Sequence, residues 1–319
     1  MLNPIRVAVV GAGAFGRNHV RVLHESAQAQ LAGVVDVIPD RASAAAAQFG
    51  CSTFITHADL IGKVDAAIVA VPTSSHATVG CELMEAGIDV LVEKPIAPDR
   101  ESAERLIHTA ERHGRILMIG HLERFNPGVM ALKKIVTHPL FFEVHRLSLF
   151  SPRSLDIDVV LDLMIHDLDI VLDMVGQAPE EIRAAGIRVL SEKVDIANVR
   201  LAFSTGCIAN LTASRVSTER VRKLRLFQPS QYISLDYSRQ EGAVFAVQGD
   251  QKIDFQMLAV EKNEPLKVEV EHFLDCVATR RTPLVTGKDG LRALDAALAI
   301  LAKIEEHKQV VVSQLKSLS

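Results

Sequence analysis

The sequence contains no tryptophan and only two tyrosines, and aromatic residues make up 4% of its 319 residues. Surfaces that bind nucleic acid commonly combine exposed aromatic side chains with a dense basic patch. Lysine and arginine are instead scattered along this chain, and the net charge is -4. We therefore expect no nucleic-acid partner.

Cysteine is also scarce, and the four residues Cys51, Cys81, Cys207 and Cys276 include no CxxC pair of the kind used by zinc sites and redox dithiols. No apolar run reaches the ~18 residues needed to span a bilayer. The first sixteen residues lack the basic start of a signal peptide. The sequence thus predicts reduced thiols, no membrane partner and a cytoplasmic location.

The length of the chain favours two domains, each with its own core. Residues 1–121 alternate short apolar runs with amphipathic stretches, a pattern typical of an α/β domain with a doubly wound parallel sheet, the Rossmann fold. We expect strands at 5–10, 31–36, 66–71, 90–93 and 116–119, and helices at 14–25, 41–49, 75–86 and 100–113.

Residues 122–319 have a different rhythm, in which short β-type runs follow one another closely. This spacing predicts a C-terminal α+β domain with a large, mostly antiparallel sheet. We expect strands at 141–149, 187–190, 198–203, 207–214, 223–227, 232–237 and 243–248, and helices at 159–175, 266–280 and 290–307.

A glycine-rich turn, Gly11-Ala-Gly13-Ala14-Phe15-Gly16, follows the first expected strand and opens the first helix. In this context the spacing indicates dinucleotide binding. Gly11 would allow the tight turn, Gly13 would let the backbone approach the pyrophosphate, and Gly16 would permit close packing of helix and strand. The start of the helix would favour the negative charge.

The second expected strand ends at Asp36, 20 residues after Gly16, where a carboxylate can accept hydrogen bonds from the adenosine ribose. A 2′-phosphate would be repelled there, so NAD is expected and NADP is disfavoured. The nearby Arg41 either softens this preference by meeting a phosphate or lies in solvent at a helix start.

Two further motifs, Pro72-Thr73-Ser-Ser-His76 and Glu93-Lys94-Pro95, come at the carboxyl ends of expected strands, where ligands bind in this architecture. Lys94 lies between an apolar strand and a proline, so its ammonium can be held partly desolvated beside a substrate hydroxyl. The alternative is an ordinary surface lysine in a loop.

In the second domain, Asp162, His166, Asp169 and Asp173 recur at helical spacing, so they would line one polar face that meets water or a cleft. Asp162 and His166 are one turn apart, and the carboxylate can orient the imidazole for proton transfer. The alternatives are a solvated acidic face or a metal site. We expect no metal, because hydride transfer to NAD, the expected cofactor, needs none.

Taken in order and spacing, these motifs resemble the Gfo/Idh/MocA family of glucose-fructose oxidoreductase and inositol dehydrogenase relatives, over the whole chain. The resemblance implies that Lys94 is the catalytic lysine and that Thr73 and His76 lie in the loop on the nicotinamide side of the cofactor. It also implies that Asp162 and His166 form the Asp-x-x-x-His pair that works opposite the lysine. A homodimer or homotetramer formed through the open sheet face is a family-level expectation.

The segments Asp158-Val-Val-Leu161 and Gly120-His-Leu-Glu-Arg124-Phe-Asn126-Pro look more like members that act on nucleotide sugars, UDP-N-acetylglucosamine 3-dehydrogenases among them, than like inositol dehydrogenases. Arg124, Asn126, Arg146 and Arg153 could meet a diphosphate or sugar hydroxyls. The arginines could equally be interface or surface residues.

The resulting hypothesis is an NAD-dependent oxidoreductase that moves a hydride from a secondary alcohol of a sugar or nucleotide sugar to the nicotinamide. His166 would be the leading acid-base, Asp162 its orienting partner, and Lys94 the group that polarises the forming carbonyl or shares the proton. The sequence does not rank Lys94 against His166 as the base. The alternatives are a free sugar or cyclitol dehydrogenase and a non-catalytic NAD-binding sensor.

Overall fold

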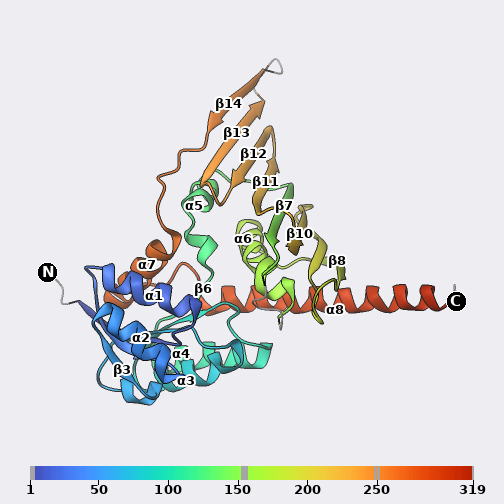
Figure 1. Cartoon of the computed structure of the whole chain (residues 1–319). Helices are drawn as coiled ribbons and strands as arrows, with labels where there is room; N and C mark the ends of the chain where they lie inside the picture. The colour runs from blue at the N-terminus through green and yellow to red at the C-terminus, as the bar shows by residue number, and fades with distance from the viewer. Residues whose placement is uncertain (1–3, 152–156, 248, 250–251, 318–319) are drawn as a thin grey trace. The chain divides into compact units, whose positions relative to one another are not determined.

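The computed structural model describes residues 4–151, 157–247, 249 and 252–317 (Figure 1). The chain divides into two compact units, the first made of Met1–Phe125 and Glu264–Leu291 and the second of Asn126–Asn263 and Arg292–Ser319. The boundary expected at residue 121 lies close to this division, whereas the return of Glu264–Leu291 to the first unit had no signal in the sequence.

The first unit contains a parallel sheet of six strands in the order β3-β2-β1-β4-β5-β6. This is the strand order of a doubly wound Rossmann domain, so the expected α/β fold is confirmed. β3 was not expected, because three residues are too few for a periodic pattern. The strands are β1 (Ile5–Val10), β2 (Ala29–Val35), β3 (Ser52–Phe54), β4 (Ala66–Val69), β5 (Asp89–Glu93) and β6 (Leu117–Gly120).

The helices of this unit begin and end at local signals in the sequence. The Asp99 carboxylate caps α4 by accepting a hydrogen bond from the Ser102 N–H at 2.8 Å, and Gly114 ends that helix with φ +59°. The helices are α1 (Ala14–Glu25), α2 (Pro39–Phe49), α3 (His76–Glu85), α4 (Arg100–His113) and α7 (Pro265–Thr279). Short 3₁₀ turns cover His57–Leu60, Thr73–Ser75 and Leu122–Phe125.

The second unit contains an eight-stranded sheet in the order β14-β13-β12-β11-β7-β10-β9-β8. Among the described strands of this sheet only β7 and β10 pair in parallel, so the mostly antiparallel sheet is confirmed. Its strands are β7 (Phe141–Leu149), β8 (Glu181–Ile187), β9 (Ile196–Ala202), β10 (Ile208–Ser217), β11 (Val221–Gln228), β12 (Gln231–Asp236), β13 (Glu241–Val247) and β14 (Ile253–Met257). The helices that start in or cross into this unit are α5 (Pro127–Lys133), α6 (Ile165–Val175) and α8 (Gly287–Ser317).

Two expected elements of the second unit are wrong in detail. The strand expected at 187–190 lies earlier in the chain, as β8 (Glu181–Ile187), and residues 188–190 are outside it because the Asp195 carboxylate accepts hydrogen bonds from the N–H groups of Val189, Leu190 and Ser191 and holds a turn there. The helix expected over 159–175 is regular only in α6, and a π-helical turn at Val160–Met164 precedes it.

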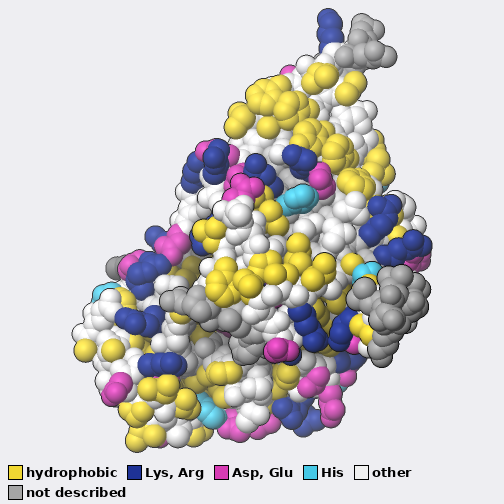
Figure 2. Space-filling model, turned by 45° about the vertical axis from the view of Figure 1, so that its right-hand side comes forward, with side chains coloured by type: hydrophobic (Ala, Val, Ile, Leu, Met, Phe, Trp, Pro, Cys, Tyr) yellow, Lys and Arg dark blue, Asp and Glu magenta, His cyan; other side chains and the backbone are white. Residues whose placement is uncertain are grey.

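One face of the second sheet packs on α6 and on the second-unit part of α8, and alternate side chains form the core between them. The opposite face carries a row of aromatic side chains on neighbouring strands, in which each ring contacts the next. Figure 2 shows hydrophobic side chains gathered over the β12–β14 end of this sheet. The row consists of Phe141, Phe227, Tyr232, Phe245 and Phe255.

Candidate functional site

The glycine-rich turn of the first unit has no room for side chains at two of its three glycines. Gly11 has φ +100°, and a Cβ there would lie 2.5 Å from the Ala70 carbonyl oxygen. A Cβ on Gly16 would overlap the Gly11 carbonyl oxygen, whereas a Cβ on Gly13 would meet nothing within 4 Å. The open space is therefore at the glycine predicted to face the pyrophosphate, at the N-terminus of α1, where exposed Ala14 and Phe15 follow.

Asp36 lies directly after β2, and both of its carboxylate oxygens already hold backbone groups. Oδ2 accepts from the Ala12 N–H of the glycine-rich turn at 2.7 Å, and Oδ1 accepts from the Ile38 N–H at 2.8 Å. A carboxylate has about four acceptor positions, so two remain for ribose hydroxyls. Arg41 is exposed on α2.

The turn that carries Lys94 is tied to the neighbouring loop by His76. The imidazole lies between two carbonyl oxygens, with Nδ1 2.9 Å from that of Pro95 and Nε2 3.0 Å from that of Val71. Burial lowers the pKa of His76, so a neutral ring donates to one of these oxygens. His76 thus braces the loop rather than facing solvent, while Thr73 and Lys94 are half-buried and Pro72 is exposed.

These predicted residues gather at one edge of the first sheet. β2, β1, β4 and β5 are adjacent and parallel, so Asp36, Gly11 and Lys94, which follow three of their carboxyl ends, share that edge with the Val71–Thr73 loop. This is where doubly wound sheets bind ligands.

Glu93 ends β5 just before Lys94, and its carboxylate is almost fully buried at 7% exposure. Oε1 lies 2.7 Å from Nε2 of His19 on α1, and Oε2 accepts from the Lys94 N–H at 3.2 Å. A third buried side chain, Glu269 of α7, reaches the same place, and the three residues bring ligand-type atoms within 4.8 Å of one another. Glu93 was predicted at the site, whereas His19 and Glu269 were not.

His121 is a further residue that the sequence did not single out, although it lies within the segment 120–127. It follows β6, the next strand along the same edge, and is 1% exposed. Burial lowers the pKa of His121 to about 3, and the positive charges of Arg124 and Lys94 contribute. A neutral imidazole therefore lies close enough to Lys94 to feel its charge.

In the second unit, Asp162 lies in the π-helical turn and His166 in the first turn of α6, and both side chains are half-buried. π-helical turns are frequent at functional sites. The expectation that the whole acidic stripe faces water or a cleft is wrong at Asp169, which is 2% exposed. The pairing of Asp162 with His166 stays a prediction.

Arg146 is occupied inside the second unit. Its guanidinium forms two hydrogen bonds to the Asp167 carboxylate, at 2.7 and 2.9 Å, and lies over the Tyr237 ring. Both charged side chains are at most 2% exposed. The suggestion that Arg146 meets a diphosphate or lies on a surface is therefore wrong in this structure.

The remaining predicted substrate residues have structural contacts of their own. Arg124, 5% exposed, donates to the Leu284 carbonyl oxygen at 3.3 Å. Asn126, 3% exposed, caps α5 through the Gly128 N–H and donates to the Tyr237 carbonyl oxygen. Arg153 lies outside the described residues.

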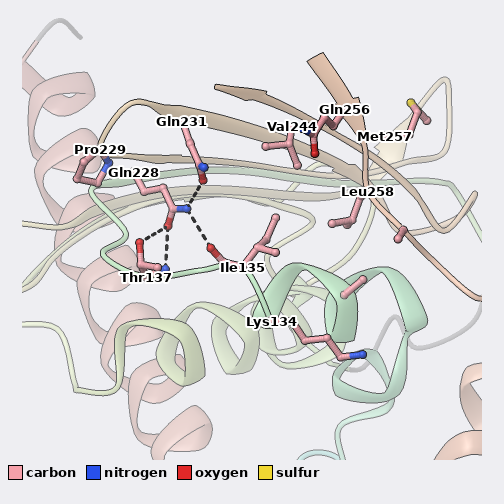
Figure 3. Close-up of a pocket in the computed structure, with 12 residues that line it drawn as sticks. Lys134, Ile135, Thr137, Gln228, Pro229, Gln231, Val244, Gln256, Met257 and Leu258 are labelled. Atoms are coloured by element: carbon pink, nitrogen blue, oxygen red, sulfur yellow. Dashed lines mark hydrogen bonds between the residues drawn. The ribbon is translucent and has the colours of Figure 1, made fainter. Parts of the chain in front are cut away.

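A cavity of about 700 Å³ lies within the second unit, between α5 and the β11–β14 part of the sheet (Figure 3). Its wall is held by Gln228, whose side chain hydrogen-bonds to Thr137, to the Ile135 carbonyl oxygen and to Gln231. None of the predicted site residues that the structure describes lines this cavity. It is thus separate from the proposed chemistry.

Comparison with known proteins agrees with this geometry. Residues 5–121 match the model of the Gfo/Idh/MocA oxidoreductase family with its NAD-binding Rossmann fold, and residues 147–228 match the C-terminal domain model of that family. The chain belongs to the Gfo/Idh/MocA family. It is therefore an oxidoreductase with an NAD-binding Rossmann domain, and both expectations are confirmed.

Among its relatives, UDP-N-acetylglucosamine 3-dehydrogenase of Acidithiobacillus ferrooxidans is 37% identical over 96% of this chain and 99% of its own length. A solved structure of that enzyme has a TM-score of 0.90 at 36% identity and the same coverage. Inositol 2-dehydrogenase of Rhizobium meliloti is 25% identical over 97% of this chain and 99% of its own length. No described helix is both long and apolar enough to cross a membrane.

Proposed function

We propose that this oxidoreductase oxidises a ring hydroxyl of a nucleotide sugar, and that the 3-hydroxyl of UDP-N-acetylglucosamine is its first candidate. The observation that carries the proposal is the convergence of the glycine-rich turn, Asp36 and Lys94 on one sheet edge. The full-length similarity to a UDP-N-acetylglucosamine 3-dehydrogenase supports the substrate.

Each residue is proposed for one task. Gly13 and the first N–H groups of α1 hold the pyrophosphate, and Asp36 accepts from the ribose hydroxyls, which favours NAD over NADP. Bound NAD supplies the hydride acceptor at its nicotinamide. His166 takes the hydroxyl proton with Asp162 orienting its ring, and the Lys94 ammonium stabilises the negative charge that develops on the sugar oxygen.

Substrate binding is proposed for Arg124, Asn126 and Arg153. The side chains of Arg124 and Asn126 are almost fully buried and have structural contacts of their own. The role of Glu93, Thr73 and Pro72 is to shape the loop on the nicotinamide side, which His76 braces. The cytoplasmic location stays a prediction.

The test is an assay of NADH formation by the purified chain with UDP-N-acetylglucosamine, free N-acetylglucosamine and myo-inositol. We expect turnover only with the nucleotide sugar, and competition by UDP alone. Turnover with myo-inositol that is insensitive to UDP would replace this proposal by the cyclitol reading, which the inositol dehydrogenase relatives support. NAD binding without turnover on any of the three would overturn the substrate assignment.

We also propose that the open face of the second sheet, with its aromatic row, joins copies of this chain into a dimer or tetramer. Phe227 and Phe255 on this row are 38% and 55% exposed, and Met257 beside it is 61% exposed. Contiguous apolar surface of this kind marks interfaces. Replacing Tyr232 and Phe245 by serine should give a monomer in light scattering; an unchanged mass would remove this face from the assembly.

A further inference from the structure

The buried carboxyl group of Glu269 has no role in the chemistry described so far. It projects from the second turn of α7 and is 0% exposed, and neither of its oxygens has a hydrogen-bond partner among the described residues. Leaving a polar group buried in this way is energetically costly, and more so when the group is charged. Such a group calls for an explanation beyond packing.

The neighbours of Glu269 identify the explanation. Among the described histidine, cysteine, aspartate and glutamate side chains, Glu93 of β5 and His19 of α1 form a group with it in which the ligand-type atoms lie within 4.8 Å of one another. Glu93 is in turn bonded to His19 and to the backbone N–H of Lys94. A side chain that fixes the Glu93 carboxylate therefore also fixes the peptide that carries Lys94.

Two carboxylates cannot both stay ionised at such a distance without water or a counter-cation. Burial raises the pKa of Glu269 well above its ordinary range, and the charge of Glu93 raises it further. With one proton on Glu269, the pair changes from two repelling anions to a donor facing an acceptor, directly or through one buried water.

We propose that Glu269 is a positioning residue: a carboxylic acid that keeps its proton and holds the Glu93 carboxylate in place. Through Glu93 it also holds the backbone of Lys94 at the carboxyl ends of the first sheet's strands, where we propose that the cofactor binds. This inference rests on the proposed role of Lys94. When Glu269 is neutral, the group formed by His19, Glu93 and Glu269 carries a single negative charge, that of Glu93.

Three variants separate this role from simple packing. Glu269→Gln keeps the shape and a donor but carries no ionisable proton, Glu269→Leu keeps most of the volume without any donor, and Glu271→Gln is a matched control. Glu271 lies on the same helix two residues away, where its half-exposed carboxylate faces Lys267.

Two readouts need no enzymatic activity. The infrared difference spectrum of wild type minus Glu269→Gln at neutral pH should contain the C=O band of a protonated carboxylic acid. The difference spectrum of wild type minus Glu271→Gln should lack this band. The amide resonance of Lys94, whose N–H donates to Glu93, should shift in Glu269→Leu and stay in place in Glu269→Gln. The inference would be overturned if the carboxylic acid band were missing from the wild type minus Glu269→Gln spectrum, or if the Lys94 amide resonance had the same position in the wild type and both Glu269 variants. Either result would count even if the enzyme turned over normally.

Kinetics provides the third readout. For Glu269→Leu we expect kcat to fall about 10-fold or more, because small displacements of catalytic groups are costly, while NAD affinity is retained. Glu269→Gln should recover most of that loss. If the wild type has no activity on any sugar, the proposed substrate fails while the infrared and resonance tests still decide the inference. Stoichiometric divalent metal in the purified protein, lost in Glu269→Gln, would overturn it in favour of a metal site.

Discussion

The two units handle buried charge in opposite ways. In the second unit, Arg146 and Asp167 neutralise each other through two hydrogen bonds while almost fully buried. In the first unit, Glu93 and Glu269 are buried beside the imidazole of His19, and His121 is buried near two cations. We expect the paired charges of the second unit to matter for stability, and the groups of the first unit to matter at the sheet edge where we propose that the chemistry takes place.

The strongest way to sharpen this contrast is to remove Lys94. The variant Lys94→Ala should lose about 10²- to 10⁴-fold in kcat, the usual contribution of one acid-base or charge-stabilising group, with NAD affinity and unfolding free energy nearly unchanged. Steady-state kinetics, NAD titration and denaturant unfolding give the three values. Normal turnover would remove Lys94 from the mechanism.

In the second unit the corresponding change should act on stability. Asp167→Ala removes the carboxylate that forms two hydrogen bonds to the buried Arg146 guanidinium, and should lower the free energy of unfolding by about 3–5 kcal/mol. The matched control is Asp173→Ala on the same helix, which removes the carboxylate of a partly exposed pair with Lys133 and should cost no more than about 1 kcal/mol. Equal losses in urea unfolding would erase the contrast between buried and exposed pairs.

His121 makes the contrast dependent on pH. Its folded pKa of about 3 lies below the unfolded value of about 6.5, so the unfolded chain binds the extra proton as the pH falls through this window. The contribution of neutral His121 to the free energy of unfolding is therefore fully present above about pH 6.5. It is lost as the pH falls toward 3, by at most about 1.4 kcal/mol per pH unit.

Urea unfolding at a series of pH values should show this slope in the wild type and a flatter curve in His121→Phe. A substitution of the exposed His108 serves as the control and should leave the slope in place. A slope unchanged in His121→Phe would assign the acid sensitivity to other groups.

Glycine substitutions should produce the smallest effects. They test how much room each site has for a methyl group, whereas the preceding variants test charge. Gly13→Ala places a methyl group in open space at the predicted pyrophosphate site, and should weaken NAD binding about 10-fold, or ~1.4 kcal/mol, without loss of stability. In Gly186→Ala the methyl group meets Val194 and Ile304 in the second core, which should cost about 1–3 kcal/mol of stability and leave NAD affinity alone. Calorimetry and thermal unfolding distinguish the two, and the reverse pattern would contradict both assignments.

The sequence predicted the elements that have strong local signals. β1, α1, α4 and β7 have the expected bounds, because a glycine turn, an Asp99 cap, a Gly114 stop and regular alternation mark them within a few residues. The short β3 and the π-helical turn before α6 lack such signals, since neither produces a periodic pattern of its own.

The candidate site was predictable where its residues belong to compact motifs and unpredictable where tertiary contact creates them. Lys94, Asp36 and the glycines follow strand ends that can be recognised locally. His19 and Glu93 meet across 74 residues, and Glu269 joins them from a segment that returns late in the chain. A buried acid of this kind has no sequence signature, because only the assembled unit removes it from water.

The two backbone hydrogen bonds of Asp36 have a consequence for coenzyme engineering. Replacing the acid at this position by a small neutral residue would remove the charge that repels a 2′-phosphate. Here that change would also release the Ala12 amide, and with it the turn that we propose for the diphosphate. We expect Asp36→Ala to impair both coenzymes, so a switch of preference would need a side chain that still accepts from Ala12.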